Sequence, residues 1–93
     1  MIVSFKTAAL LAVANGENPK GFPSDCVKRT RMMLTLLDAA IDLNDMRSPP
    51  GNPLETLSGD RAGQHSVRVN KQWPICFTWT PEGPENVEFV DYH

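Results

Sequence analysis

Apolar and polar residues are spaced differently in the two halves of the chain. Across residues 26–41 the apolar residues recur every three or four positions, which is the spacing of one face of an α-helix. Residues 6–15 are rich in alanine and leucine, and Gly16, which follows them, is a common helix stop. We therefore predict two helices, with Ser24 as the N-cap of the longer one. Residues 38–46 either extend that helix or form a second, short one.

Beyond Pro53 the apolar residues alternate with polar ones, as they do in a half-buried β-strand. Short turn sequences that suit antiparallel hairpins separate the alternating segments, which are QHSVRVN, WPICFTW and NVEFV. Residues 2–5 also suit a short strand. The predicted fold is α+β, a single domain over residues 1–93 whose N-terminal helices pack on a small, mainly antiparallel sheet.

The alternation also predicts which side chains lie together on the sheet face that points away from the helices. Ser66, Arg68 and Pro74 belong to that set, which is either a solvated sheet face or a functional surface. Proline has no backbone N–H to donate and is tolerated mainly at strand starts and edges. His65 alternates with the apolar set instead, so we expect it to be a partly buried packing residue.

The charge distribution bears on possible partners more than the total does. A formal net charge of −2 argues against tight, autonomous binding to nucleic acid, because such binding comes from neutralising phosphates. Residues 61–79 nevertheless contain Arg61, Arg68 and Lys71 and no acidic residue, and residues 1–37 hold a further excess of cations. These two segments either form a local basic patch or belong to a mixed, solvated surface.

Several classes of chemistry find no support in the sequence. Cys26 and Cys76 are too few for a disulfide framework, so we expect two reduced, buried thiols in a cytosolic protein. His65 and His93 do not fall at a metal-ligand spacing with them. No run of eighteen apolar residues predicts a membrane span, and the start lacks the basic segment of a signal peptide.

Four motifs in the second half of the chain occur in an order that resembles one protein family. They are LDAA, a strand with the pattern LxGxRxGxxSxRVN, a QW hairpin and a terminal DYH, spread over residues 37–93. Each motif is weak alone, but their order resembles the HigB-type toxins of the RelE/ParE superfamily, which belong to bacterial type II toxin-antitoxin pairs. The resemblance covers nearly the whole chain and implies a RelE-like fold, with the same helices-on-sheet arrangement.

The resemblance also implies an activity and its partners. Relatives of this type are ribosome-dependent mRNA endoribonucleases (mRNA interferases) that cleave messenger RNA in the decoding site, which inhibits translation and arrests growth. They need no metal or cofactor, because the RNA supplies its own 2′-hydroxyl to attack the scissile phosphate. The implied partners are the ribosome with its mRNA and a HigA-type helix-turn-helix antitoxin, through which alone DNA would be contacted. The implied location is the bacterial cytoplasm.

The residues that match the family's site receive their roles from the same resemblance. His93 is the candidate for proton transfer, since an imidazole changes charge near neutral pH, and Tyr92 would orient a base or a phosphate. Asp91 would hold neighbouring groups, and Arg68 would bind the scissile phosphate through its planar guanidinium. Further predicted RNA contacts are Arg61, Ser66 and Lys71.

The sequence departs from the family pattern at two places. The hairpin pattern QWR is QWP here, so Pro74 replaces an arginine that would meet the transition-state phosphate. Loss of one preorganised donor typically costs on the order of a hundred- to a thousand-fold in rate. We therefore hypothesise a weakened toxin, selected or engineered, or else a variant that compensates through Arg68 and His93. Some relatives also have a histidine and a lysine near LETLSG, where this chain has Glu55 and Ser58.

Two alternatives belong to other functional classes. ParE-type relatives share the fold but inhibit DNA gyrase by protein contact, without catalysis. A catalytically silent module that only binds the antitoxin is the other possibility. The DYH ending beside a strand that carries Arg68 favours the nuclease.

Overall fold

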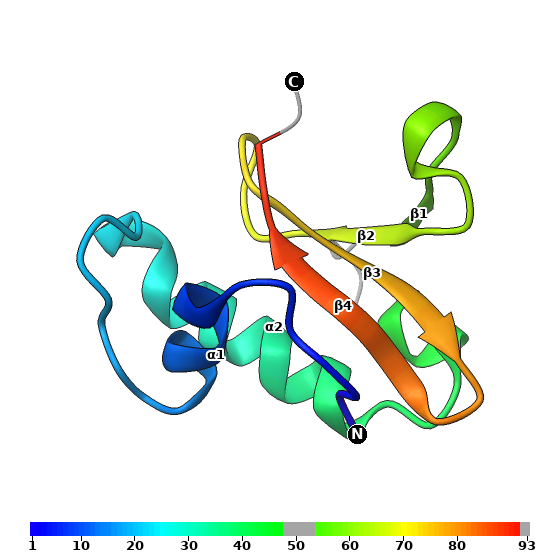
Figure 1. The fold of residues 1–93 in the computed structure, drawn as a ribbon, viewed down its shortest axis with the longest axis horizontal. Helices are drawn as coiled ribbons and strands as arrows, with labels where there is room; N and C mark the ends of the chain where they lie inside the picture. The colour runs from blue at the N-terminus through cyan, green and yellow to red at the C-terminus, as the bar shows by residue number, and fades with distance from the viewer. Residues whose placement is uncertain (48–53, 92–93) are drawn as a thin grey trace.

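The computed structural model describes residues 1–47 and 54–91, and it places the helices on one side of a four-stranded sheet (Figure 1). This is the α+β arrangement that the sequence predicts. The α-helices are α1 (Ala8–Ala14) and α2 (Val27–Ala39), and the strands are β1 (Leu54–Thr56), β2 (His65–Arg68), β3 (Pro74–Thr80) and β4 (Gly83–Phe89). Three 3₁₀ turns complete the elements: η1 (Ser24–Cys26), η2 (Leu43–Arg47) and η3 (Gly59–Arg61).

The sheet is an antiparallel meander in which each strand pairs with the next along the chain. Strands β2, β3 and β4 correspond to the three alternating segments. The sequence does not predict strand β1, because a strand of three residues is too short to show an alternating pattern. It pairs with β2 and places Glu55 opposite Ser66.

The N-terminal segment runs beside β4 rather than forming a full strand. The predicted strand over residues 2–5 is reduced to one parallel bridge between Phe5 and Val87. The backbone N–H of Lys6 donates to the carbonyl of Val87 at 2.9 Å, which fixes this segment along the free edge of β4. Gly83, at φ +129°, leaves room for the backbone of Met1, with which a side chain at this position would collide.

The two helices begin and end for local reasons. The side chain of Thr7 accepts the N–H of Leu10 at 3.3 Å and caps α1, which ends before Gly16 as predicted. The prediction of Ser24 as the N-cap of α2 is wrong, because the carbonyl of Pro23 accepts the N–H of Cys26 and starts a tighter 3₁₀ turn. The α-helix therefore begins one turn later. Of the two options after α2, the structure has the short separate helix, η2.

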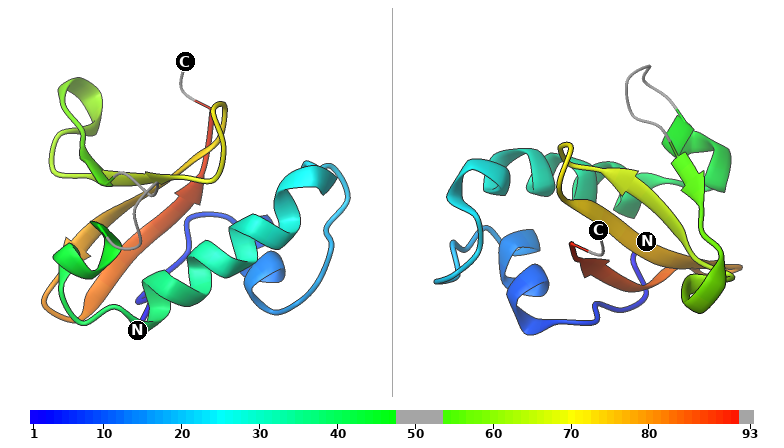
Figure 2. Two further views of the ribbon diagram at one scale, coloured as in Figure 1. Left: turned by 180° about the vertical axis from the view of Figure 1, so that it is seen from behind. Right: turned by 90° about the horizontal axis from the view of Figure 1, so that it is seen from above.

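Figure 2 shows the helices and the sheet from two further directions, and the hydrophobic core lies between the helices and one face of that sheet. Side chains from both helices and from β2, β3 and β4 meet there with almost no exposed surface. The alternation of apolar residues is therefore confirmed as the pattern of the helix-facing side. The buried core includes, from the helices, Leu10, Val13, Met33, Leu34 and Leu37, and from the sheet and its connections, Val67, Val69, Ile75, Phe77 and Val87. Within the described ranges, no helix is long and apolar enough to cross a membrane.

Candidate functional site

The sheet face that points away from the helices, here called the outer face, brings together the predicted strand residues. Cross-strand pairing forms one continuous row across all four strands, which consists of Glu55, Ser66, Cys76 and Glu88. In the next row Arg68 lies directly opposite Pro74. Ser66, Arg68 and Pro74 thus share one face, as the alternation predicts.

The middle of the outer face is buried, which a simple solvated sheet face would not be. The side chain of Arg68 is 48% exposed, whereas Ser66 is only 2% exposed and Cys76 only 1%. Pro74 is buried as well. A direct contact between Ser66 and RNA would therefore require this part of the surface to open.

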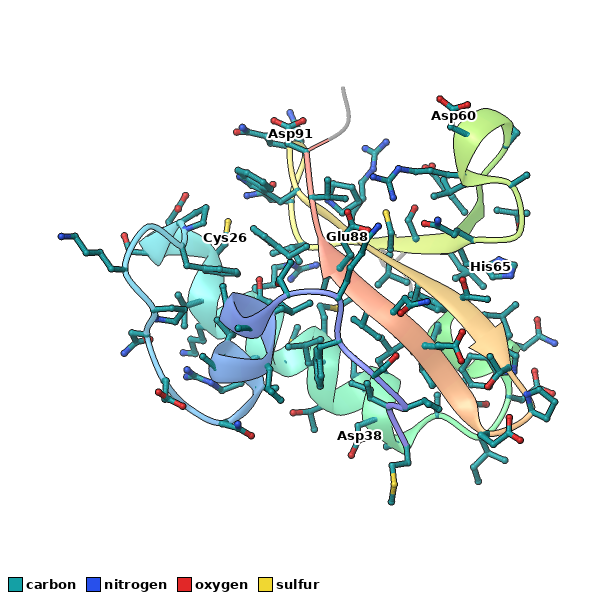
Figure 3. All side chains as sticks on the ribbon, viewed as in Figure 1. Cys26, Asp38, Asp60, His65, Glu88 and Asp91 are labelled. Carbon is teal, nitrogen blue, oxygen red and sulfur yellow. The ribbon has the colours of Figure 1, made fainter. Side chains whose placement is uncertain are left out.

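Carboxylates and cations are paired around the buried centre. Arg68 Nη2 lies 3.6 Å from Glu55 Oε1, and both side chains are about half exposed. Glu88, whose side chain is 13% exposed, contacts two cations, with Lys6 Nζ 3.2 Å from Oε2 and Arg61 Nη2 3.5 Å from Oε1. Figure 3 labels Glu88 near the end of β4, with Asp91 beyond it on the same segment of the chain. Arg61 also donates to Gln64 Oε1 at 3.1 Å.

The two cysteines are free and buried, as predicted, but they occupy different environments. Cys26 belongs to the core, whereas Cys76 lies on the outer face among charged side chains. Burial raises the pKa of the Cys76 thiol to about 11, and the carboxylate of Glu88 adds to the rise, while Arg61 and Lys6 oppose it. A thiol that stays protonated at neutral pH is a poor nucleophile, so Cys76 is a structural residue.

Pro74 occupies the first position of β3, where a strand loses least from a missing backbone donor. Its carbonyl still accepts a hydrogen bond from the N–H of Val90 at 3.3 Å, so the pairing with the end of β4 is intact. Proline is therefore compatible with the fold at this position. It places an uncharged side chain directly opposite Arg68.

The end of β4 is held against the connection between β2 and β3. Gln72 Nε2 donates to Asp91 Oδ2 at 3.0 Å, and the rings of Trp73 and Phe89 stack with their centroids 4.7 Å apart. These contacts place Asp91 beside the hairpin that carries Pro74. The other two residues of the DYH motif, Tyr92 and His93, lie outside the described residues.

The remaining predicted residues lie around this centre. Lys71 is exposed in the connection between β2 and β3. His65 is partly buried, as predicted, with its Nδ1 3.2 Å from Thr56 Oγ1. Among residues 1–47 and 54–91, no group of three histidines, cysteines or carboxylates is arranged to hold a metal ion.

Sequence reasoning missed Lys6 and Glu88 as residues of the outer face. The sequence pattern places Lys6 in the first helix, but in the structure Lys6 precedes the cap at Thr7 and its ammonium reaches Glu88 on the sheet. Glu88 belongs to the polar set of NVEFV, which was the one available signal. A pocket of about 290 Å³ between the N-terminal segment and both helices contains none of the predicted site residues.

Comparisons with known proteins match the chain to one family and to two relatives. Residues 4–93 match the family described as HigB-like toxin, RelE-like toxin of type II toxin-antitoxin system HigB. The chain is 39% identical over 71 residues to Toxin HigB-1 of Vibrio cholerae, which covers 76% of this chain and 74% of that protein. An uncharacterized protein of Haemophilus influenzae is 33% identical over 78 residues, or 84% of this chain and 76% of the relative.

Proposed function

Because this chain belongs to the HigB-like family of RelE-like toxins from type II toxin-antitoxin systems, we propose that it is a ribosome-dependent mRNA endoribonuclease weakened at Pro74. As a toxin of this kind it is expected to have an antitoxin partner. One observation carries the proposal: Arg68 lies opposite Pro74 on the outer face, and Asp91 is tied to the same hairpin.

Arg68 is proposed to bind the scissile phosphate. Its guanidinium is half exposed, and its ion pair with Glu55 is of the kind that contributes about 1 kcal/mol or less, because water screens it. A phosphate can therefore displace Glu55, and the planar guanidinium then offers it two parallel hydrogen bonds. Holding the phosphate in line with the RNA's own 2′-hydroxyl converts the attack into a positioned, intramolecular step.

The proton transfers are proposed for the end of the chain. His93 would move a proton at the 2′-hydroxyl or the leaving oxygen, Tyr92 would orient the reacting groups, and Asp91 would hold them in place. Asp91 already lies 3.0 Å from Gln72 in the hairpin.

Pro74 is proposed to weaken the reaction because the outer face lacks a second cation opposite Arg68. An arginine there would stabilise the negative charge that develops on the non-bridging oxygens of the scissile phosphate in the transition state. The remaining proposed RNA contacts are Arg61, which reaches Glu88 over the outer face, Lys71 in the connection between β2 and β3, and Ser66, which could contact RNA only if the surface above it opened. No step needs a metal or a cofactor.

The proposed partners follow from this function. The decoding site of the ribosome would present the mRNA, which suits a protein with a net charge of −2. A HigA-type helix-turn-helix antitoxin would neutralise the toxin, and DNA would be contacted only through that antitoxin. The proposed location is the bacterial cytoplasm.

Primer extension on a messenger RNA from induced cells tests the proposal. Three chains are compared: the present one, its Pro74→Arg variant, and the Pro74→Arg, His93→Ala double variant. We expect strong cleavage only by Pro74→Arg, with loss of cleavage on adding His93→Ala.

Two outcomes would overturn the nuclease. Growth arrest without RNA cleavage by any of the three chains would point to an inhibitor that acts by protein contact, such as a ParE-like one. Normal growth without cleavage, together with capture of the antitoxin, would leave only a silent antitoxin-binding module.

A further inference from the structure

Glu88 holds two cations at once on the outer face, and one of them comes from the N-terminal segment. Lys6 Nζ lies 3.2 Å from one oxygen of its carboxylate, and Arg61 Nη2 lies 3.5 Å from the other. The three groups carry a net charge of +1 together. This cluster therefore still attracts an anion after the internal pairing.

Lys6 is the member of the cluster that a ligand can reach. Its side chain is 57% exposed, whereas those of Arg61 and Glu88 are 25% and 13% exposed. An ammonium group has three donors, so Lys6 can keep Glu88 and still bind a second oxygen. Arg61 is fixed further by Gln64 at 3.1 Å and serves as the rigid side of the cluster.

The cluster lies on the same face as Arg68 but at the opposite side of the sheet. Glu88 ends the row that begins at Glu55, and Arg68 belongs to β2, two strands away from β4. Neighbouring strands are about 4.8 Å apart, so about 10 Å separates β2 from β4. An RNA strand with one phosphate at Arg68 can therefore cross the sheet toward Lys6. All three residues of the cluster lie close enough to Cys76 to affect the pKa of its thiol. Arg61 and Lys6 lower that pKa, and Glu88 raises it.

We propose that Lys6 is an RNA-binding residue that contacts a second phosphate of the strand held at Arg68, and that Glu88 is the positioning residue that keeps Lys6 over the outer face. This inference rests on the proposed function. It extends the candidate site from the β2–β3 hairpin to the N-terminal segment, which the family motifs in residues 37–93 do not include.

The salt dependence of RNA binding tests the inference. Fluorescence anisotropy of a labelled single-stranded RNA oligonucleotide is measured between 50 and 200 mM salt with the full chain and with Lys6→Gln. Each lost phosphate contact reduces the slope of log affinity against log salt by about 0.7 for a single strand. The affinity of the unchanged chain divided by that of Lys6→Gln is then expected to fall by about 2.6-fold as the salt concentration rises from 50 to 200 mM.

Three further variants serve as controls. Lys6→Arg keeps the charge and should restore the slope. Lys28→Gln removes an equally charged, exposed residue on α2, away from the outer face, and should leave the slope unchanged. Arg68→Gln should reduce the slope as Lys6→Gln does. Thermal unfolding of each variant confirms that it remains folded.

The outcomes separate this inference from the proposed function. Three results would overturn the inference. Lys6→Gln could have the same slope as the unchanged chain, Lys28→Gln could lose as much slope as Lys6→Gln, or the unchanged chain could show no measurable binding. If Arg68→Gln alone lowers the slope, Lys6 is excluded while the nuclease proposal stands. If Lys6→Gln lowers the slope but primer extension shows no cleavage by any chain, the RNA contact stands and the nuclease fails.

Discussion

At the scale of single residues, Arg68 has an uncharged residue on one side and a carboxylate on the other. It lies directly opposite Pro74, which carries no charge, and its guanidinium lies 3.6 Å from Glu55. In the proposed function, an arginine at position 74 would add positive charge for a phosphate. Glu55 is an internal anion that the phosphate would have to displace.

Replacing Glu55 should therefore increase cleavage once an arginine is present at position 74. In the Pro74→Arg chain we expect Glu55→Gln to raise the ribosome-dependent cleavage rate by up to about 5-fold, since an exposed ion pair is worth about 1 kcal/mol or less. For the same reason its free energy of unfolding should change by less than about 1 kcal/mol. Single-turnover cleavage assays and urea denaturation measure the two quantities.

Glu82→Gln in the turn between β3 and β4 is the matched control, because it removes the same charge from an exposed position away from Arg68. A fall in cleavage with Glu55→Gln would contradict a purely competing role. It would show instead that this carboxylate takes part in the reaction.

The buried thiol of Cys76 makes a prediction about pH. Its pKa is raised from an ordinary 9.0 to about 11, so the unfolded chain loses this proton at a lower pH than the folded chain. The resulting stabilisation is complete below pH 9 and is lost as the pH rises toward 11. We expect roughly 2 kcal/mol of the free energy of unfolding to disappear over this range.

Cys76→Ala tests this assignment by urea denaturation at several pH values. The variant should be less stable at every pH because of the cavity, but its stability should fall less steeply between pH 9 and 11. Cys26 is present in both chains and cancels from the comparison. An equally steep fall in the variant would assign the pH dependence to other groups.

At the scale of elements, the starts of the two helices show where local sequence signals succeed and fail. Thr7 and Ser24 are both good N-cap residues followed by helix-forming sequence. Only Thr7 caps a helix, because Pro23 directs the chain into a 3₁₀ turn before α2 begins. The difference depends on the backbone hydrogen bond from Cys26, which residue type alone does not specify.

These two positions should respond differently to the same substitution. Thr7→Ala is expected to lower the free energy of unfolding by about 1 kcal/mol, since it leaves the N–H of Leu10 without its cap. Ser24→Ala should lower it by less than about 0.5 kcal/mol, as at an ordinary surface position. Urea denaturation of both variants measures this, and equal losses would contradict the assigned caps.

At the scale of the whole molecule, the two faces of the sheet differ. One face is apolar and packs against the helices, and the outer face carries charged side chains. The helices cover one side of the sheet, so functional chemistry on the sheet is confined to the other. That side carries at least three cations, Lys6, Arg61 and Arg68, although the chain as a whole has a net charge of −2. Binding to free RNA should accordingly be weak and sensitive to salt.

This balance predicts that the ribosome must supply much of the positioning of the RNA. Purified Pro74→Arg protein should leave free mRNA intact and cut the same mRNA when it occupies the decoding site. Gel analysis of the RNA with and without assembled ribosomes measures the difference, and ribosomes without the protein are the control. Cleavage of free mRNA at a comparable rate would contradict the proposed dependence on the ribosome.

The sequence by itself determined the parts of this protein that depend on near neighbours in the chain. Helical spacing predicts α1 and α2, alternation predicts β2, β3 and β4 together with their buried faces, and ordered motifs predict the family. Tertiary structure alone decided which charges meet. Lys6 and Glu88, or Glu55 and Arg68, come together only because the chain path brings distant segments onto one face. Burial of Ser66 and Cys76 is decided in the same way, because it depends on what covers the sheet and not on the pattern within a strand.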